Sequence, residues 1–187
     1  MTETETLCNG KWLRLMKRGR WEYAERTNPG GGVIIIAVTN DDNVLFVEQP
    51  RPAIDGRTIE MPAGLVGDVA THANESAVDA AHRELVEETG YRAGRIDFLM
   101  AGPTSPGMSN EILAFVLARD LERVHAGGGD DTEEIVVHEV PRRTAAAWLI
   151  DKMGEGYAID PKSFAGLYML ENGAVFAASP GADAQHP

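Results

Sequence analysis

The sequence has little of several features that define particular classes of protein. It contains one cysteine, Cys8, so an internal disulfide framework is excluded and a reducing, intracellular compartment is the default expectation. No apolar run is long enough to cross a membrane as a helix, and the N-terminal MTETETLC lacks the pattern of a signal peptide. We therefore expect a cytoplasmic protein that does not insert into membranes.

Basic residues are also scarce relative to acidic ones. The formal net charge of −12 argues against nonspecific binding to nucleic acid or to anionic membranes. An anionic substrate would therefore need local basic residues or bound cations. The length of 187 residues suits one domain with a real core and a small appendage.

The most informative stretch reads RELVEETG at residues 83–90. If it is helical, Glu84, Glu87 and Glu88 stand at i, i+3 and i+4 and share one face. Three like charges so close repel one another, whereas Mg²⁺ or Mn²⁺ would bind hard carboxylate ligands there. The alternative interpretation is a solvated acidic face that holds no metal.

Local signals set the ends of this helix. Ser76 followed by Asp79 resembles a capping box, and Gly90 suits the exit of the helix. The pattern predicts a helix over residues 77–88. Its other side carries an apolar stripe for packing on a core, formed by Val78, Ala81 and Leu85.

The same stretch resembles the signature of the Nudix hydrolases. That signature is a glycine, five residues, a glutamate, seven residues and then Arg-Glu-aliphatic-X-Glu-Glu-X-Gly-aliphatic. Here Glu75, seven residues and the run 83–91 match, with Tyr91 in place of the last aliphatic residue. The first glycine departs from the signature: Gly64 is the best candidate, and ten residues separate it from Glu75. We interpret residues 66–73 as a lengthened loop.

Hydrophobic patterns outline the remaining elements. Residues 1–10 look frayed, and the aromatic segment 11–26 reads as a β-hairpin. Further strands and helices are predicted as follows: strands at 33–39, 44–48, 58–61, 96–101, 112–118 and 135–140, and helices at 144–153 and 161–171. Interleaved strands and few helices indicate an α/β or α+β sandwich.

The Nudix resemblance implies an α/β/α sandwich with a mixed sheet, preceded by the N-terminal β-hairpin. We expect a hairpin region at residues 1–30, a Nudix domain at 31–177 and a disordered tail at 178–187.

Motifs outside the signature are similar to those of ADP-ribose pyrophosphatases. They are VEQPRP at residues 47–52, EMPAG at 60–64, SPG at 105–107 with Glu111, GKW at 10–12 and WE at 21–22. Pro106 lies sixteen residues after Gly90, the placement of a proline that marks this subgroup. In the subgroup, hairpin tryptophans from two subunits of a dimer sandwich the adenine, so the resemblance implies a homodimer.

The resemblance also implies the metal ligands. Glu84, Glu87 and Glu88, with the backbone carbonyl of Ala63, are expected to hold Mg²⁺ or Mn²⁺. Bound metal ions would neutralise the charge of a diphosphate and lower the pKa of a bound water.

Substrate-binding residues follow from the same motifs. Trp12 and Trp21 are candidates for stacking on a purine, although hairpin tryptophans are often simple packing residues. Arg51 offers a bidentate fork to phosphate, the alternative being a surface arginine beside prolines. Glu22 and Glu111 complete the expected substrate site.

The catalytic base is expected on a loop well after the signature. Glu133 and Glu134 follow the glycine-rich segment 126–131, which composition marks as a mobile loop. The spacing to Pro141 favours Glu133, the alternative being an acidic loop that is only solvated.

The sequence therefore predicts metal-dependent hydrolysis of ADP-ribose to AMP and ribose 5-phosphate. One alternative is hydrolysis of another nucleoside diphosphate sugar. The other is a sensor that binds ADP-ribose without cleaving it, although all the signature glutamates are present. The expected partners are a small nucleotide sugar and a second subunit, with no nucleic acid or membrane.

Overall fold

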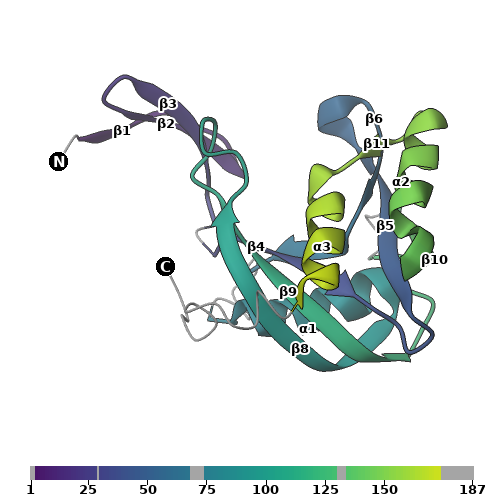
Figure 1. The fold of residues 1–187 in the computed structure, drawn as a ribbon. Coiled ribbons are helices and arrows are strands. Elements are labelled where there is room, and N and C mark those ends of the chain that lie inside the picture. The colour runs from purple at the N-terminus through teal and green to yellow at the C-terminus, as the bar shows by residue number, and fades with distance from the viewer. Residues whose placement is uncertain (1–2, 29, 68–73, 130–133, 174–187) are drawn as a thin grey trace.

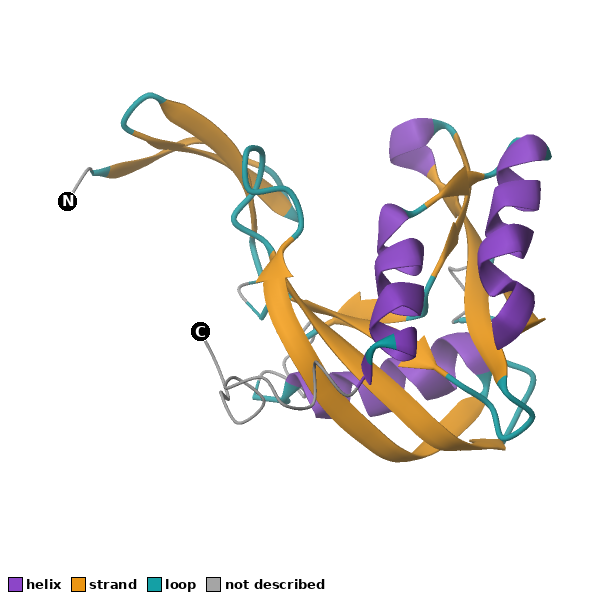
Figure 2. Ribbon diagram, viewed as in Figure 1, coloured by secondary structure: helices purple, strands orange, loops and turns teal. Residues whose placement is uncertain are grey.

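The computed structural model describes residues 3–28, 30–67, 74–129 and 134–173, which form a mixed α/β fold with three sheets (Figures 1 and 2). The elements in chain order are β1 (Thr4–Asn9), β2 (Leu13–Arg18), β3 (Trp21–Arg26), β4 (Gly32–Ala37), β5 (Asn43–Arg51), the 3-10 helix η1 (Pro52–Ile54), β6 (Gly56–Glu60), β7 (Ala63–Leu65), α1 (Ala77–Thr89), β8 (Tyr91–Pro103), β9 (Ile112–Arg123), β10 (Val136–Pro141), the 3-10 helix η3 (Arg142–Thr144), α2 (Ala145–Gly154), β11 (Ala158–Ile159) and α3 (Pro161–Glu171).

The central sheet has the strand order β7-β4-β9-β8. Strands β4 and β9 run parallel, with Val33 opposite Ala114, and the other pairs in this sheet are antiparallel. The sheet is therefore mixed, as predicted. Every residue of β4 from Val33 to Ala37 is buried, which confirms that this β-branched run is covered on both faces.

The two faces of the central sheet pack into two separate apolar clusters. Val33 and Ile35 of β4 face α1, where they meet Ala81 and Leu85. The alternate residues of β4 face the second sheet together with α2 and α3, in a cluster that includes Ile34, Ile36, Phe46, Ile59, Leu149 and Leu167. The alternation follows from the two-residue period of a strand.

The second sheet has the order β10-β5-β6-β11. Strands β5 and β6 form an antiparallel pair in which Val47 lies opposite Glu60 and Arg51 lies opposite Gly56. The short strand β11 is parallel to β6 and leads directly into α3. This sheet brings the side chains of Arg51 and Glu60 to the same face.

The third sheet, β1-β2-β3, projects away from the rest of the molecule at the upper left of Figure 1. The predicted hairpin is present as β2 and β3. The expectation that residues 1–10 are frayed was wrong, because β1 pairs with β2. Every residue of β1 is exposed, so its sequence lacks the alternating pattern that would reveal a strand.

The remaining differences concern short or extended elements. Strands β7 and β11 were not predicted, and β8 and β9 extend beyond the expected ranges. The expected tail at residues 178–187 lies outside the described residues, as does most of the expected loop at 66–73. In the part of the chain that the structure describes, no helix is long and apolar enough to span a bilayer.

Candidate active site

Helix α1 begins at the predicted residue, Ala77, and ends at Thr89, one residue after the predicted end. The Ser76 hydroxyl accepts a hydrogen bond from the Asp79 N–H, and the Asp79 carboxylate accepts from the Ser76 N–H, so the capping box is complete. Gly90 ends the helix in the left-handed conformation with φ of 74°. These caps place the three signature glutamates on successive turns of one helix.

Glu88 is the most deeply buried of these glutamates. It is only 5% exposed, and its Oε2 accepts a hydrogen bond of 3.0 Å from the backbone N–H of Ala63. A buried carboxylate needs such a donor, because burial without a partner disfavours the charged form. The contact therefore fixes Glu88 beside the start of β7.

Gly64, the next residue of β7, lies directly against Glu84. A Cβ atom built on Gly64 would stand 1.9 Å from the Glu84 Cδ, so any larger residue would force this carboxylate to move. The glycine that the signature seemed to lack thus has a steric role at residue 64. The extra residues before Glu75 do not separate Gly64 from α1.

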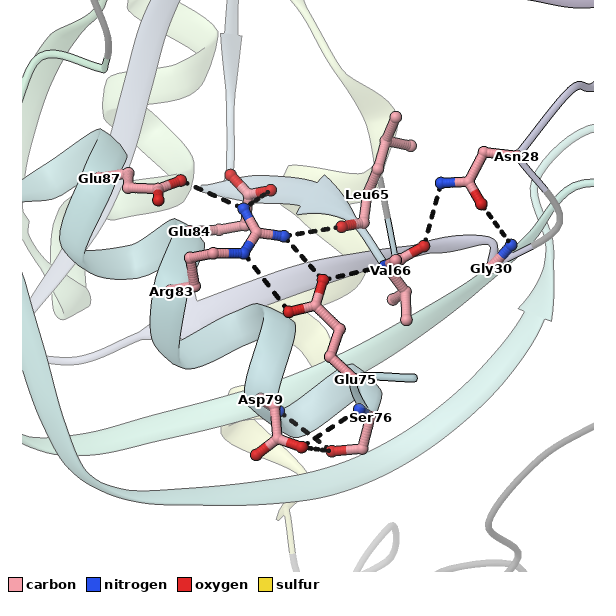
Figure 3. Close-up of polar contacts among 11 residues, drawn as sticks. Asn28, Gly30, Leu65, Val66, Glu75, Ser76, Asp79, Arg83, Glu84 and Glu87 are labelled. Atoms are coloured by element: carbon pink, nitrogen blue, oxygen red, sulfur yellow. Dashed lines mark hydrogen bonds and ion pairs between the residues drawn. The ribbon is translucent and has the colours of Figure 1, made fainter. Parts of the chain in front are cut away.

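Arg83 connects the glutamates of α1 (Figure 3). Its guanidinium donates to Glu75 at 2.9 Å, to Glu84 at 2.8 Å and to Glu87 at 3.2 Å. It also donates to the backbone carbonyl of Leu65 at 3.0 Å. Burial opposes the charge, but these carboxylates outweigh it and raise the pKa of Arg83, so the side chain stays cationic.

The carboxylate oxygens of the acidic face are suitable ligands for a divalent cation, although the side chains are not grouped closely enough to hold one. No three His, Cys, Asp or Glu side chains in the described residues stand close enough together to hold a metal ion. Arg83 contacts two of the relevant carboxylates, those of Glu84 and Glu87, so this face already binds positive charge. Hard carboxylate oxygens beside Gly64, which leaves room for Glu84, fit Mg²⁺ or Mn²⁺.

Arg51 is the last residue of β5, in the second sheet. Its Nε and Nη2 donate to the two oxygens of Glu60, both at 2.7 Å, and the Thr58 hydroxyl also donates to Glu60. The fork that was expected to bind phosphate is therefore engaged with Glu60 on one side. The sequence did not reveal this pair, because the pattern of one strand does not show which residues of the next strand it contacts.

The aromatic part of the expected site lies between β3 and the loop that joins β8 to β9. A hollow of about 430 Å³ is lined there by Arg18, Trp21, Glu22, Tyr23, Pro103, Pro106, Gly107, Ser109, Asn110 and Ile112. Trp21 and Glu22 thus line the same hollow. Trp12 does not line this hollow and is 68% exposed.

Glu111 lies near that hollow but has protein partners. Its carboxylate accepts hydrogen bonds from Arg26, at the end of β3, and from the Thr104 hydroxyl at 3.3 Å. Together with the bond from the Ala24 N–H to the Met108 carbonyl at 2.8 Å, it attaches the N-terminal sheet to the rest of the fold.

The expected base, Glu133, lies outside the described residues. Its neighbour Glu134 is described: its side chain is 78% exposed and forms an ion pair of 3.0 Å with Arg57. Gly128 and Gly129, earlier in the same segment, donate backbone hydrogen bonds to the carbonyls of Glu88 and Glu87. The glycine-rich segment therefore packs on the last turn of α1, a use of glycine that composition alone did not reveal.

Comparison with known proteins identifies the family. The model of the NUDIX domain matches residues 28–156. The methanol dehydrogenase activator of Bacillus methanolicus is 31% identical over 140 residues, which are 72% of this chain and 73% of that protein. The ADP-ribose pyrophosphatase of Bacillus subtilis (strain 168) is 31% identical over 138 residues, which are 71% of this chain and 72% of that protein.

A GDP-mannose pyrophosphatase of Enterobacter sp. (strain 638) is 32% identical over 158 residues, covering 80% of this chain and 75% of that protein. A crystal structure of an ADP compounds hydrolase has the same fold, with a TM-score of 0.72 over 94% of each chain and 19% sequence identity. The family match spans more than half of the sequence and includes the capped acidic helix and the strand that contacts it. The chain therefore belongs to the Nudix hydrolase family.

Proposed function

We propose that this enzyme hydrolyses the diphosphate bond of ADP-ribose, adding one water and releasing AMP and ribose 5-phosphate. The observation that carries the proposal is the contact of the acidic helix face with β7, where Ala63 binds Glu88 and Gly64 makes room for Glu84. The similarity to an ADP-ribose pyrophosphatase from Bacillus subtilis supports the choice of substrate.

Glu84, Glu87 and Glu88, with the carbonyl of Ala63, are the proposed ligands of Mg²⁺ or Mn²⁺. Such an ion, when bound, neutralises diphosphate charge and lowers the pKa of a bound water. Glu88 is held in place by the Ala63 N–H, and Glu84 is seated against Gly64. Both carboxylates are thereby held beside β7, where a bound ion would draw the proposed ligands together.

The proposed nucleotide site combines aromatic and charged side chains. Trp21 and Glu22 line the hollow beside β3, where a base would stack with a gain of about 1–3 kcal/mol. Trp12 lies outside that hollow in the same chain, so its proposed stacking role requires the second subunit. Arg51 would bind the diphosphate. Glu111, which accepts a hydrogen bond from Thr104, would contact the substrate beside the hollow.

Glu133 is the proposed general base. The support is its place in the chain: residues 128 and 129 are bonded to the last turn of α1, and Glu134 is bonded to Arg57 of β6. One flank of this short segment is therefore attached to α1, which carries the proposed metal ligands, and the other to β6, which pairs with the strand β5 that carries Arg51. A cytoplasmic location stays a prediction of the sequence.

A second candidate substrate is another nucleoside diphosphate sugar. The relative from Enterobacter named GDP-mannose pyrophosphatase is as similar to this chain as the ADP-ribose enzyme. The chemistry at the diphosphate would be the same, and only the base and sugar contacts would differ. The sensor alternative is disfavoured, because Glu84, Glu87 and Glu88 are all present on α1.

A substrate screen tests the proposal. The purified chain would be incubated with Mg²⁺ and with ADP-ribose, GDP-mannose, ADP-glucose or UDP-glucose, and products would be separated by anion-exchange chromatography. We expect AMP and ribose 5-phosphate, with kcat/KM highest for ADP-ribose. Higher kcat/KM for GDP-mannose would select the second candidate, and binding of ADP-ribose without turnover would select the sensor.

A further inference from the structure

We propose that Glu60 is a positioning residue that holds the Arg51 guanidinium away from Glu88 and turns its free edge toward the diphosphate. The inference rests on the proposed function, in which Arg51 contacts substrate and Glu88 holds the metal. It assigns a role to a glutamate that lies outside the acidic helix.

The contact between the two side chains is bidentate. Nε and Nη2 of Arg51 each lie 2.7 Å from a different oxygen of Glu60. The Glu60 side chain is 10% exposed and also accepts a hydrogen bond from Thr58, so its orientation is fixed from two sides. This geometry uses one edge of the planar guanidinium and leaves the Nη1 edge for another anion. The Arg51 side chain is 45% exposed, so that anion can reach it.

Arg51 also lies within the electrostatic reach of Glu88. The hydrogen bond to Glu60 is the main cause of the raised pKa of Arg51, and the Glu88 carboxylate contributes to the same direction. Glu60 ends β6 three residues before Ala63, which donates to Glu88 at 3.0 Å. Three residues span at most about 10–11 Å, so both carboxylates lie near one short segment. Besides Glu60, two carboxylates act electrostatically on Arg51, and Glu88 contributes more than Asp160.

Without the charge of Glu60, Glu88 becomes the stronger attraction for Arg51. A guanidinium paired with Glu88 would compete with a divalent cation for the same oxygens. It would also be withdrawn from the diphosphate. Loss of Glu60 should therefore weaken two functions together, metal binding and substrate binding.

The neighbouring strands contain a matched control. Glu48 and Arg57 form a second cross-strand ion pair of 2.7 Å between β5 and β6, and the side chains of Glu48 and Glu60 are 11% and 10% exposed. Glu48 lies opposite Ile59 and contacts His138, on the face turned away from Arg51. Glu48→Gln thus removes a buried charge from the same two strands without touching Arg51.

The experiment measures Mn²⁺ affinity from the electron paramagnetic resonance signal of free Mn²⁺, alongside KM for ADP-ribose and the melting temperature. For Glu60→Gln we expect Mn²⁺ affinity to fall by about 10–100-fold, the range for groups that orient metal ligands, and KM to rise. In Glu60→Gln with Arg51→Met, Mn²⁺ affinity should return close to wild type while KM stays raised. Glu48→Gln should lower the melting temperature and change neither affinity nor KM.

Wild-type Mn²⁺ affinity in folded Glu60→Gln, or weak affinity that persists in the double variant, would overturn the inference. Glu60→Asp keeps the charge and provides a second variant if Glu60→Gln does not fold. It should bind Mn²⁺ more tightly than Glu60→Ala, and equal weakening in both would also overturn the inference. If the wild type binds Mn²⁺ but does not hydrolyse ADP-ribose, the proposed function fails, whereas the Mn²⁺ comparison still tests Glu60.

Discussion

Arg83 illustrates how single side chains control the acidic helix. Glu84, Glu87 and Glu88 would repel one another in isolation, yet Arg83 contacts two of them and also binds Glu75. Its side chain is 16% exposed, so these ion pairs are less screened than surface pairs. Each glutamate is thus held by a specific neighbour before any metal binds.

Glu88→Gln should abolish most of the hydrolytic activity. Hydrolysis is expected to require Mg²⁺ or Mn²⁺, and the variant should lose at least about 100-fold in kcat, more than loss of a group that only orients a ligand. Chelator titration and steady-state kinetics measure both effects, with circular dichroism to confirm folding. Glu155→Gln, at an exposed end of α2, should behave as wild type. A folded Glu88→Gln variant with near-normal turnover would reject the proposed metal site.

Gly64→Ala tests the steric role of glycine next to α1. The added methyl would stand 1.9 Å from the Glu84 Cδ, so the carboxylate must move. We expect Mn²⁺ affinity to fall by about 10–100-fold. Gly154→Ala is the control, because a Cβ there would meet nothing within 4 Å. Equal Mn²⁺ affinity of both variants would show that Glu84 can move without consequence.

The segment around the three consecutive glycines shows how one element depends on another. Gly127, Gly128 and Gly129 all have positive φ, and a Cβ on Gly127 would stand 2.4 Å from the carbonyl carbon of Thr89. The N–H groups of Gly128 and Gly129 donate to the carbonyls of Glu88 and Glu87 at the end of α1, which have no partner within the helix, and the Gly127 N–H donates to His125 Nδ1. Helix α1 and this segment therefore form one structural unit.

The proposed base, Glu133, follows this glycine segment in the chain. Glu133→Gln is expected to lower kcat by about 10²–10⁴-fold and to change KM only a few-fold. Glu134→Gln is the internal control: its exposed ion pair with Arg57 contributes at most about 1 kcal/mol, so turnover should stay near wild type. Steady-state kinetics on ADP-ribose measures both variants. A larger loss in Glu134→Gln would place the base one residue later, and no loss in either would direct attention to Glu87 and Glu111.

At the scale of the whole molecule, no layer formed by the described residues covers the N-terminal sheet (Figure 1). It exposes several large apolar side chains: Leu7, Trp12, Leu13, Leu15 and Trp21. Apolar residues gathered on a projecting sheet are typical of a protein–protein interface. A second copy of the chain is the proposed partner.

Sedimentation should therefore report a homodimer at micromolar concentration. Leu13→Glu combined with Leu15→Glu introduces charge on this sheet, where the two side chains are 49% and 41% exposed, and should shift the protein toward monomer. Ile150→Glu is the control, because Ile150 is 56% exposed but lies on α2. A wild-type monomer with full activity would contradict the proposal.

The stability of the whole fold should depend on two buried glutamates at low pH. Burial alone would raise the pKa of Glu48, but hydrogen bonds from His138 and Arg57 outweigh it and leave the pKa below its ordinary value of 4.5. At Glu60, burial also acts to raise the pKa, but hydrogen bonds from Arg51 and Thr58 outweigh it and lower the pKa. A lowered folded-state pKa stabilises the fold above about pH 4.5, and that contribution is lost as pH falls through the folded value.

Urea denaturation between pH 3 and pH 7 measures this dependence. The free energy of unfolding of the wild type should fall as the pH drops below the ordinary glutamate value. Glu48→Gln should be less stable than wild type at pH 7 and should show a shallower decline in acid. Parallel curves for the two proteins would mean that Glu48 has the same pKa in the folded and unfolded chains.

Local sequence patterns were sufficient to predict α1, its caps and the buried strand β4. The reason is that a capping box, a C-terminal glycine and the i, i+3, i+4 spacing involve residues close in the chain. The same local pattern indicated the family, which the match of the NUDIX domain confirms. Strand β1 was not predicted, because a strand that is exposed along its whole length has no alternation of apolar and polar residues.

Contacts between distant residues could be found only in the folded chain. Arg51 meets Glu60 through the register of β5 and β6, Gly64 meets Glu84 where β7 approaches α1, and the glycines after β9 meet the end of α1. A residue pattern shows what a side chain offers, whereas its partner depends on which strands and helices pack together. For this protein, the sequence therefore revealed the glutamates of α1, whereas their contacts with β7 and the pairing of Arg51 with Glu60 depend on the approach of β7 to α1 and on the register of β5 and β6.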